Sequence, residues 1–271
     1  MHWQLSGRQL NLGQPLYLAI INLTPDSFSD GGALPSPKDA IAYGGGLLRQ
    51  GAHVLDIGAE STRPGSKPVG REKQWTRMAP ALDGLKKNNQ GCILSIDTRS
   101  PQVARLALES DADIVNDVTG FQNPDMLELA KKSNCGLIAM RSRIDGDHIL
   151  MPEYLDPTPK TADAAMRELG KIKDGLLAAG IEPERILLDP GFGFGTTFFE
   201  DQSLWGALAK MPSILDWPVE RFCIGISRKR FVAHKFGVQG NESLDKKTSE
   251  LHSQAAEMGY KVFRTHSLPG H

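Results

Sequence analysis

Short runs of apolar residues recur along the chain, and each run ends on a polar or charged residue. There are eight such runs, and the residues that follow them are Asn22, Asp56, Asp97, Asn116, Arg141, Asp189, Ser227 and Arg264. Apolar runs bounded in this way are typical of strands buried on both faces, as in a parallel sheet. The pattern therefore predicts eight parallel strands with polar residues at their carboxyl ends.

Amphipathic helical patterns lie between the predicted strands. They cover residues 38–50, 72–88, 101–109, 125–132, 162–179, 203–209 and 241–258. Strand and helix alternating in this way predict an α/β fold, and one core with eight strands favours a closed (β/α)8 TIM barrel with its active site at the carboxyl ends. An open doubly wound sheet is the alternative. That fold should carry a glycine fingerprint after its first strand, and residues 22–26 contain none.

The two ends of the chain extend this picture. Residues 1–15 alternate polar and apolar positions around Gly7, which predicts a small hairpin capping the bottom of the barrel. Only five residues follow His266, so we expect the eighth helix to be missing or truncated, leaving an apolar strip that usually finds a partner. No linker-like stretch divides residues 1–271, which predicts a single domain.

Charge and cysteine content narrow the class of protein. The formal net charge is −1, so no global basic field favours nucleic acid or an anionic membrane. Cys92, Cys135 and Cys223 form no CxxC pair, which indicates reduced core residues in a cytoplasmic protein. The sequence shows neither a signal peptide nor a stretch apolar enough to span a bilayer.

Five motifs stand in order at the predicted strand ends. They are NLTPDSFSDGG (22–32), ESTRPG (60–65), DPGFGFG (189–195), SRK (227–229) and RTH (264–266). In these motifs the chain resembles the dihydropteroate synthase family over roughly residues 16–266. One such motif is weak evidence, whereas five in series are a strong signal. The resemblance implies a folate-biosynthesis transferase with a TIM barrel, in which p-aminobenzoate attacks a dihydropterin methyl diphosphate and diphosphate leaves.

The resemblance also implies where the pterin binds. A carboxylate can accept two hydrogen bonds from the aminopyrimidinone edge of a pterin. Asp97 and Asp189, both at strand ends, can supply such a carboxylate. By resemblance, Asn116, Lys229 and Met140 complete the pterin pocket. Asp97 could instead cap the helix that follows it, an interpretation that fits its position about equally well.

The departing diphosphate needs positive charge. Arg63, Arg264 and His266 are expected to bind it, because arginine forks match phosphate oxygens. Asn22 is expected to bind the diphosphate and to supply the single protein ligand of a Mg²⁺ ion that acts as a Lewis acid. Catalysis is then assigned to Lys229, Arg264, His266 and Asp97. No general base is needed, because an arylamine is already nucleophilic near neutral pH.

The aminobenzoate is expected to meet residues of three loops. Those residues are Phe28, Thr62, Pro64, Phe194 and Arg230. Arg230 stands where the family usually has serine or another small residue. It could pair with the aminobenzoate carboxylate, fill its space and so lower affinity for aminobenzoate and sulfonamides together, or point to solvent from a surface helix.

Further departures make the chain a divergent member of the family it resembles. The family commonly has Met-His-Met-Gln-Gly after the fifth strand, Lys where Thr196 stands, and a less charged segment at 242–247; here residues 140–145 read MRSRID. Two alternatives therefore stay open beside the synthase: a pterin-binding paralogue without turnover, and a pterin-dependent methyltransferase barrel. A homodimer is also possible, since family members commonly pair.

Overall fold

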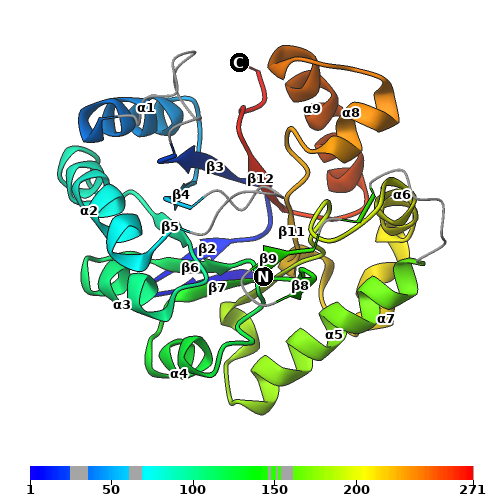
Figure 1. Cartoon of the computed structure of the whole chain (residues 1–271), viewed down its shortest axis with the longest axis horizontal. Helices are drawn as coiled ribbons and strands as arrows, with labels where there is room; N and C mark the ends of the chain where they lie inside the picture. Colours follow the sequence, from blue (N-terminus) through cyan, green and yellow to red (C-terminus); the bar gives the residue numbers. More distant parts are fainter. Residues whose placement is uncertain (25–35, 61–68, 146–147, 151, 154–160, 271) are drawn as a thin grey trace.

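The computed structural model describes residues 1–24, 36–60, 69–145, 148–150, 152–153 and 161–270. Eight parallel strands form one sheet, in the order β10-β7-β6-β5-β4-β3-β12-β11 (Figure 1). The strands are β3 (Leu16–Asn22), β4 (Val54–Gly58), β5 (Leu94–Asp97), β6 (Ile114–Asp117), β7 (Gly136–Met140), β10 (Ile186–Asp189), β11 (Cys223–Ile224) and β12 (Val262–Thr265). A parallel bridge between Leu188 and Phe222 joins the two ends of the sheet. The predicted barrel is confirmed, and the open sheet is excluded.

Helices surround the barrel on its outside (Figure 1). They are α1 (Pro37–Arg49), α2 (Arg71–Asn88), α3 (Pro101–Glu109), α4 (Pro124–Lys132), α5 (Ala162–Ala178), α6 (Phe198–Gly206), α7 (Met211–Leu215), α8 (Arg230–Phe236) and α9 (Asn241–Glu257), with 3-10 turns η1 (Pro183–Arg185), η2 (Leu208–Lys210) and η3 (Val219–Arg221). Ser36, Ser100 and Asn123 cap α1, α3 and α4 through side-chain oxygens, and each is followed by a proline at the first helical position. Sequence periodicity missed α8, which is too short to show a helical repeat.

Alternation along the strands divides the barrel interior into two zones. At the bottom, Val54, Ile114, Ile138 and Leu187 belong to one buried apolar cluster. Two residues further along the same strands stand Asp56, Asn116, Met140 and Asp189, which point inward as well because side chains alternate with a period of two. The interior therefore changes from apolar to mainly polar toward the carboxyl ends.

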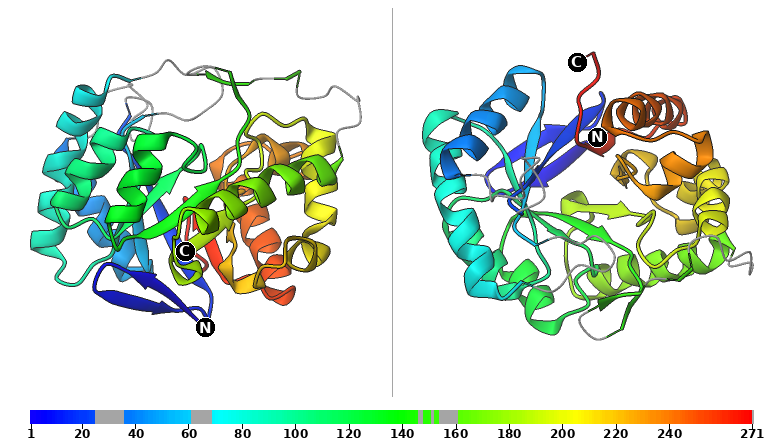
Figure 2. Two further views of the ribbon diagram at one scale, coloured as in Figure 1. Left: turned by 90° about the horizontal axis from the view of Figure 1, so that it is seen from below. Right: turned by 45° about the horizontal axis from the view of Figure 1, so that its top comes forward.

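A hairpin of β1 (His2–Leu5) and β2 (Arg8–Asn11) closes the apolar end (Figure 2). Trp3 and Leu5 are fully buried in the bottom cluster, and the Trp3 indole donates a 2.9 Å hydrogen bond to the Arg185 carbonyl. A second antiparallel pair, β8 (Ile144–Asp145) and β9 (His148–Ile149), follows β7.

The sequence predicted that the eighth helix would be missing or truncated. Within the described residues, no helix follows β12. The chain after β12 instead runs between α1 and α9 (Figures 1 and 2). There Leu268 is 3% exposed and packs into the cluster formed by the outer faces of β3 and β4 with α1 and α2. An irregular tail therefore covers part of the strip left open beside β3.

Candidate functional site

Polar side chains from several strands meet at the carboxyl end of the barrel. The strand register aligns Asp97 with Asn116, and Met140 with Asp189. All four residues are buried, with exposed fractions of 5% or less. The register therefore places four of the five residues that the sequence predicted for the pterin pocket in two neighbouring pairs at the carboxyl ends of their strands.

Arg264 crosses the barrel interior from β12. Its Nε lies 2.6 Å from Oδ2 of Asp56, and its Nη2 lies 2.6 Å from Oδ2 of Asp97. Burial opposes the charge of the guanidinium, but Asp56 and Asp97 together raise the pKa of Arg264 above its ordinary value. Arg264 is thus a fixed cation between two buried carboxylates.

Asp56 also belongs to this group of buried polar residues, and sequence reasoning did not assign it to the site. It is fully buried, accepts a 2.6 Å hydrogen bond from the Ser95 hydroxyl, and accepts longer hydrogen bonds of 3.3 and 3.4 Å from the Asn116 amide. The signal was present, because Asp56 ends the second apolar run. Its side chain orients Asn116 and Arg264, and so organises two other site residues.

Asp97 has one carboxylate oxygen that is still unsatisfied. Its Oδ2 binds Arg264, whereas its Oδ1 is buried and has no hydrogen-bond partner among the described residues. Burial raises the pKa of Asp97 to about 7; Arg264 lowers this pKa, while Asp56 contributes to raising it. Unsatisfied buried acceptors are rare because each costs free energy. This oxygen is an acceptor available to a ligand, whereas the helix-capping role that the sequence left open has no hydrogen bond to support it: α3 is capped by Ser100.

Asp189 is held by the turn that follows β10. Its Oδ1 accepts a 2.7 Å hydrogen bond from the Gly191 amide, and Gly191 adopts a left-handed conformation with φ of 72°. Burial raises the pKa of Asp189, and the charge of nearby Lys229 opposes that rise. The carboxylate orientation therefore depends on the path of this turn.

Lys229 contacts the same turn. Its ammonium donates a 2.6 Å hydrogen bond to the Phe192 carbonyl and lies 4.5 Å from the centroid of the Phe194 ring. Burial lowers the pKa of Lys229 to about 8, although Asp189 opposes this shift. Phe194 in turn packs with Met140 and Val118 in a small apolar cluster. Lys229 therefore connects the predicted pterin side of the site with an aromatic ring predicted for aminobenzoate.

His266 lies just beyond β12. Its Nδ1 is 3.0 Å from the Ser227 hydroxyl, which also accepts a 3.1 Å hydrogen bond from the His266 amide. Two contacts to one hydroxyl fix the orientation of the imidazole ring. Arg264 and His266, both predicted for diphosphate, are thus two residues apart along the chain, but the Arg264 guanidinium lies between the Asp56 and Asp97 carboxylates.

Two of the remaining predicted residues, Asn22 and Arg230, are described by the structure. Asn22 is the last residue of β3 and is partly exposed, and Arg230 is the first residue of α8, directly after Lys229. Phe28, Thr62, Arg63 and Pro64 lie outside the described residues. Within the described part of the chain, no group of three or more His, Cys, Asp or Glu side chains could hold a metal.

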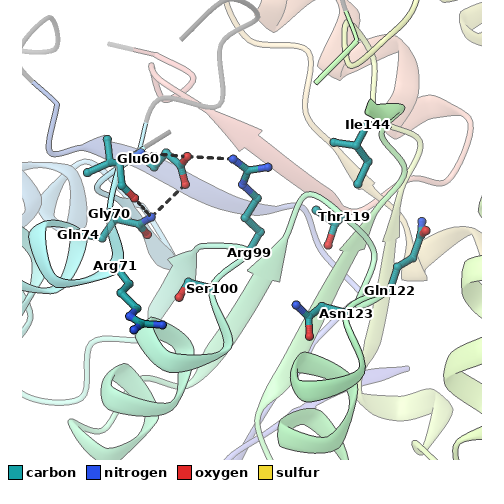
Figure 3. A pocket seen from close by; sticks show the side chains of 11 residues that line it. Glu60, Gly70, Arg71, Gln74, Arg99, Ser100, Thr119, Gln122, Asn123 and Ile144 are labelled. Atoms are coloured by element: carbon teal, nitrogen blue, oxygen red, sulfur yellow. Dashed lines mark hydrogen bonds and ion pairs between the residues drawn. The ribbon is translucent and has the colours of Figure 1, made fainter. Parts of the chain in front are cut away.

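A polar cavity of about 830 Å³ adjoins this end of the barrel (Figure 3). Its lining includes Arg71 and Arg99, together with residues at the starts of α2, α3 and α4. Arg99 donates a 3.1 Å hydrogen bond to Glu60, and Glu60 also accepts a hydrogen bond from Gln74 (Figure 3). The cavity therefore carries little net charge near Glu60.

Known proteins share both the sequence and the fold. The sequence profile of the family described as "Pterin binding enzyme" matches residues 18–266. The chain belongs to the pterin-binding enzyme family. A dihydropteroate synthase of Neisseria meningitidis serogroup C is 33% identical over 270 residues, which cover 98% of this chain and 92% of that protein.

Two solved structures illustrate the likeness. Xanthomonas albilineans dihydropteroate synthase with 4-aminobenzoic acid has a TM-score of 0.84 at 31% identity, covering 98% of this chain and 93% of that one. Yersinia pestis dihydropteroate synthase in a sulfonamide drug complex has a TM-score of 0.86 at 30% identity, covering 98% and 94%. The resemblance to dihydropteroate synthases predicted from the five motifs is confirmed.

Proposed function

We propose that this chain is a dihydropteroate synthase, which condenses 7,8-dihydropterin-6-ylmethyl diphosphate with p-aminobenzoate to give dihydropteroate and diphosphate. The observation that carries the proposal is the buried Oδ1 of Asp97, which no described residue satisfies and which lies on the strand neighbouring Asn116. A dihydropterin presents ring N–H and amino donors along one edge, which would satisfy that oxygen. The same arrangement leaves Lys229 to contact the other polar atoms of the ring.

The reaction then follows from positioning and charge. The arylamine nitrogen forms a bond to the methylene carbon while the carbon–oxygen bond to diphosphate breaks, and the nitrogen loses a proton. The electron pair of the broken bond leaves on diphosphate. Lys229 and Arg264 supply fixed positive charge near the ring, and His266 offers a ring held by Ser227 at the rim. Such preorganised charge requires little rearrangement during the reaction.

We propose Mg²⁺ as the metal of this reaction. A cage of several protein ligands is absent among the described residues, but Mg²⁺ bound to a substrate diphosphate needs only one or two protein oxygens. Asn22, partly exposed at the end of β3, offers such an oxygen. When bound, the ion would stabilise negative charge on the leaving diphosphate.

Three further proposals complete this assignment. Phe28, Thr62, Pro64, Phe194 and Arg230 are proposed to contact p-aminobenzoate, and Asn22, Arg63, Arg264 and His266 to contact diphosphate. A homodimer is proposed, which light scattering would measure. A cytoplasmic location is proposed because Cys92, Cys135 and Cys223 are buried free thiols. No helix within the described residues is long and apolar enough to cross a membrane.

Turnover tests the function directly. Purified protein with dihydropterin methyl diphosphate, p-aminobenzoate and Mg²⁺ should release dihydropteroate and diphosphate in equal amounts. Lys229→Ala and Asp97→Ala should abolish both products while retaining a cooperative thermal transition. Folded wild-type protein that binds the pterin but releases neither product would instead establish the non-catalytic paralogue, and transfer of a methyl group to a corrinoid would establish the methyltransferase.

A further inference from the structure

The segment after β10, residues 189–195, carries three groups of the proposed site. They are the Asp189 carboxylate, the Phe192 carbonyl that accepts a hydrogen bond from Lys229, and the Phe194 ring beneath the same ammonium. The segment contains three glycines with positive φ, at 191, 193 and 195. A backbone this permissive needs external contacts to hold one conformation.

Arg141 supplies such contacts at the start of the segment. Its Nε donates a 2.9 Å hydrogen bond to the Pro190 carbonyl, and its Nη2 donates a 3.1 Å bond to the Gly191 carbonyl. The side chain is 1% exposed. The Arg141 backbone takes part as well: its amide donates to the Asp189 carbonyl, and a Cβ on Gly191 would lie 1.8 Å from its carbonyl oxygen. Arg141 thus holds the backbone directly after the Asp189 side chain.

Arg143 does the same at the far end of the segment. Its Nη1 donates a 3.2 Å hydrogen bond to the Gly195 carbonyl, and its amide donates a 3.4 Å bond to the Phe194 carbonyl. A fork of two bonds, 2.9 and 2.6 Å long, ties the same guanidinium to Glu200 at the start of α6. Arg143 thus holds the backbone directly after the Phe194 side chain.

One carboxylate anchors both arginines. Glu168 on α5 receives a 3.0 Å hydrogen bond from Nη1 of Arg141 and a 3.2 Å bond from Nε of Arg143. Partial burial opposes ionisation of Glu168, but the two guanidinium groups hold its pKa below the ordinary value. Glu168 and Glu200 therefore balance the charges of the two arginines, which keeps the guanidinium groups in place beside neutral carbonyls.

We propose that Arg141 and Arg143 are positioning residues with separate tasks: Arg141 sets Asp189 for the pterin, and Arg143 sets Phe194 for the arylamine. This inference rests on the proposed synthase function. It also explains a departure from the family pattern, because Arg141 and Arg143 stand where related sequences commonly have Met-His-Met-Gln-Gly. In this chain, the two guanidinium groups hold the segment through hydrogen bonds to its backbone carbonyls.

The two tasks predict opposite kinetic effects. Arg141→Met should raise the KM for dihydropterin methyl diphosphate about tenfold and change the KM for p-aminobenzoate by about twofold at most. Arg143→Met should show the reverse pattern. Equal effects of both variants on both constants, or no effect on either, would overturn the proposal.

Arg185 provides a matched control. It too is a buried arginine whose Nε and Nη2 donate to carbonyls, those of Cys135 and Ala130, and whose Nη1 contacts a glutamate, Glu182. It precedes β10 at the opposite end of the barrel. Arg185→Met should lower the melting temperature as Arg141→Met does but leave both KM values unchanged. The same kinetic change in both variants would show that lost stability alone explains it.

A milder variant tests the same proposal if Arg141→Met or Arg143→Met fails to fold. Glu168→Gln removes the shared anchor at a side chain that is 39% exposed, and it should raise both KM values about threefold. Unchanged KM values in this variant would count against the positioning roles of Arg141 and Arg143.

If wild-type protein shows no turnover, the proposed function fails but the positioning role can still be measured. The Kd of dihydropterin methyl diphosphate by calorimetry should then rise about tenfold in Arg141→Met and stay constant in Arg185→Met. Equal Kd values in the two variants would overturn it.

Discussion

Arg264 donates a 2.6 Å hydrogen bond to Asp97, and this contact joins the last strand of the barrel to its third strand across the interior. The pair does not saturate Asp97, because the second carboxylate oxygen is buried and finds no partner in the part of the chain that the structure describes. The structure therefore keeps an acceptor whose desolvation it does not compensate. A cost to stability at a binding site is expected when the missing partner is the ligand.

Replacing Asp97 tests this cost. The folded-state pKa of about 7 lies above the ordinary value of 3.8, so the folded protein binds more protons than the unfolded chain between these pH values. Wild-type stability should therefore fall as pH rises through this window. Asp97→Asn removes the penalty, and at pH 8 it should raise the unfolding free energy by about 2 kcal/mol while abolishing turnover.

Urea unfolding of both proteins at pH 5 and pH 8 measures this difference. The advantage of Asp97→Asn should be larger at pH 8. An Asn variant that is less stable than wild type at both pH values would refute this account of the Asp97 burial cost.

Lys229 should set an alkaline limit on activity. Its pKa is lowered to about 8 by burial, so the free enzyme loses this charge in a pH range where an ordinary lysine keeps it. The value of kcat/KM should fall above pH 8. Lys229→Arg, which stays charged, should be slower throughout but should lack this alkaline limb. An identical limb in both proteins would assign it to another group.

How much of this site could be predicted depended on whether the signal was local. Asp97, Asn116 and Asp189 end apolar runs, and a parallel barrel necessarily brings such ends together. Asp56 showed the same local signal, but its role depends on strand register, which places it against Ser95. Register is not visible in one sequence.

The contacts by which Arg141 and Arg143 hold the turn after β10 could not be predicted from the sequence. The Pro190 and Gly191 carbonyls that accept hydrogen bonds from Arg141 lie about fifty residues away along the chain, and backbone carbonyls carry no sequence signature. In the sequence alone, Arg141 therefore looked like a departure from the family pattern, and this departure weakened the assignment as a synthase. Likewise α8 has only seven residues, so it shows too little periodicity to be recognised.

Arg230 should affect arylamine binding. It is the first residue of α8 and directly follows Lys229, whose ammonium lies 4.5 Å from the centroid of the Phe194 ring proposed for p-aminobenzoate. One interpretation of the sequence is that the Arg230 guanidinium pairs with the aminobenzoate carboxylate. Arg230→Ser should therefore change the KM for p-aminobenzoate and the inhibition constant of a sulfonamide about fivefold each. Lys235→Ser, near the other end of α8, is the control, and equal constants in all three proteins would place Arg230 outside the site.

His252 should make the fold sensitive to acid. It lies on the buried face of α9, its ring centroid is 4.8 Å from that of Phe263, and its Nε2 has no hydrogen-bond partner within the described residues. Burial lowers its pKa from 6.5 to about 3, so between these values the unfolded chain binds the proton and the folded protein does not. Stability from this residue is therefore complete above pH 6.5 and is lost as pH falls.

The loss should approach about 1.4 kcal/mol for each pH unit below 6.5. His252→Leu fills the same apolar site without a titrating group, so its unfolding free energy should decline less between pH 7 and pH 5 than that of the wild type. Urea unfolding at each pH gives both slopes. Parallel slopes would mean that His252 is protonated, or paired, in the folded protein. Because α9 covers β12, which carries Arg264, the same unfolding free energy includes the packing that keeps this strand in place.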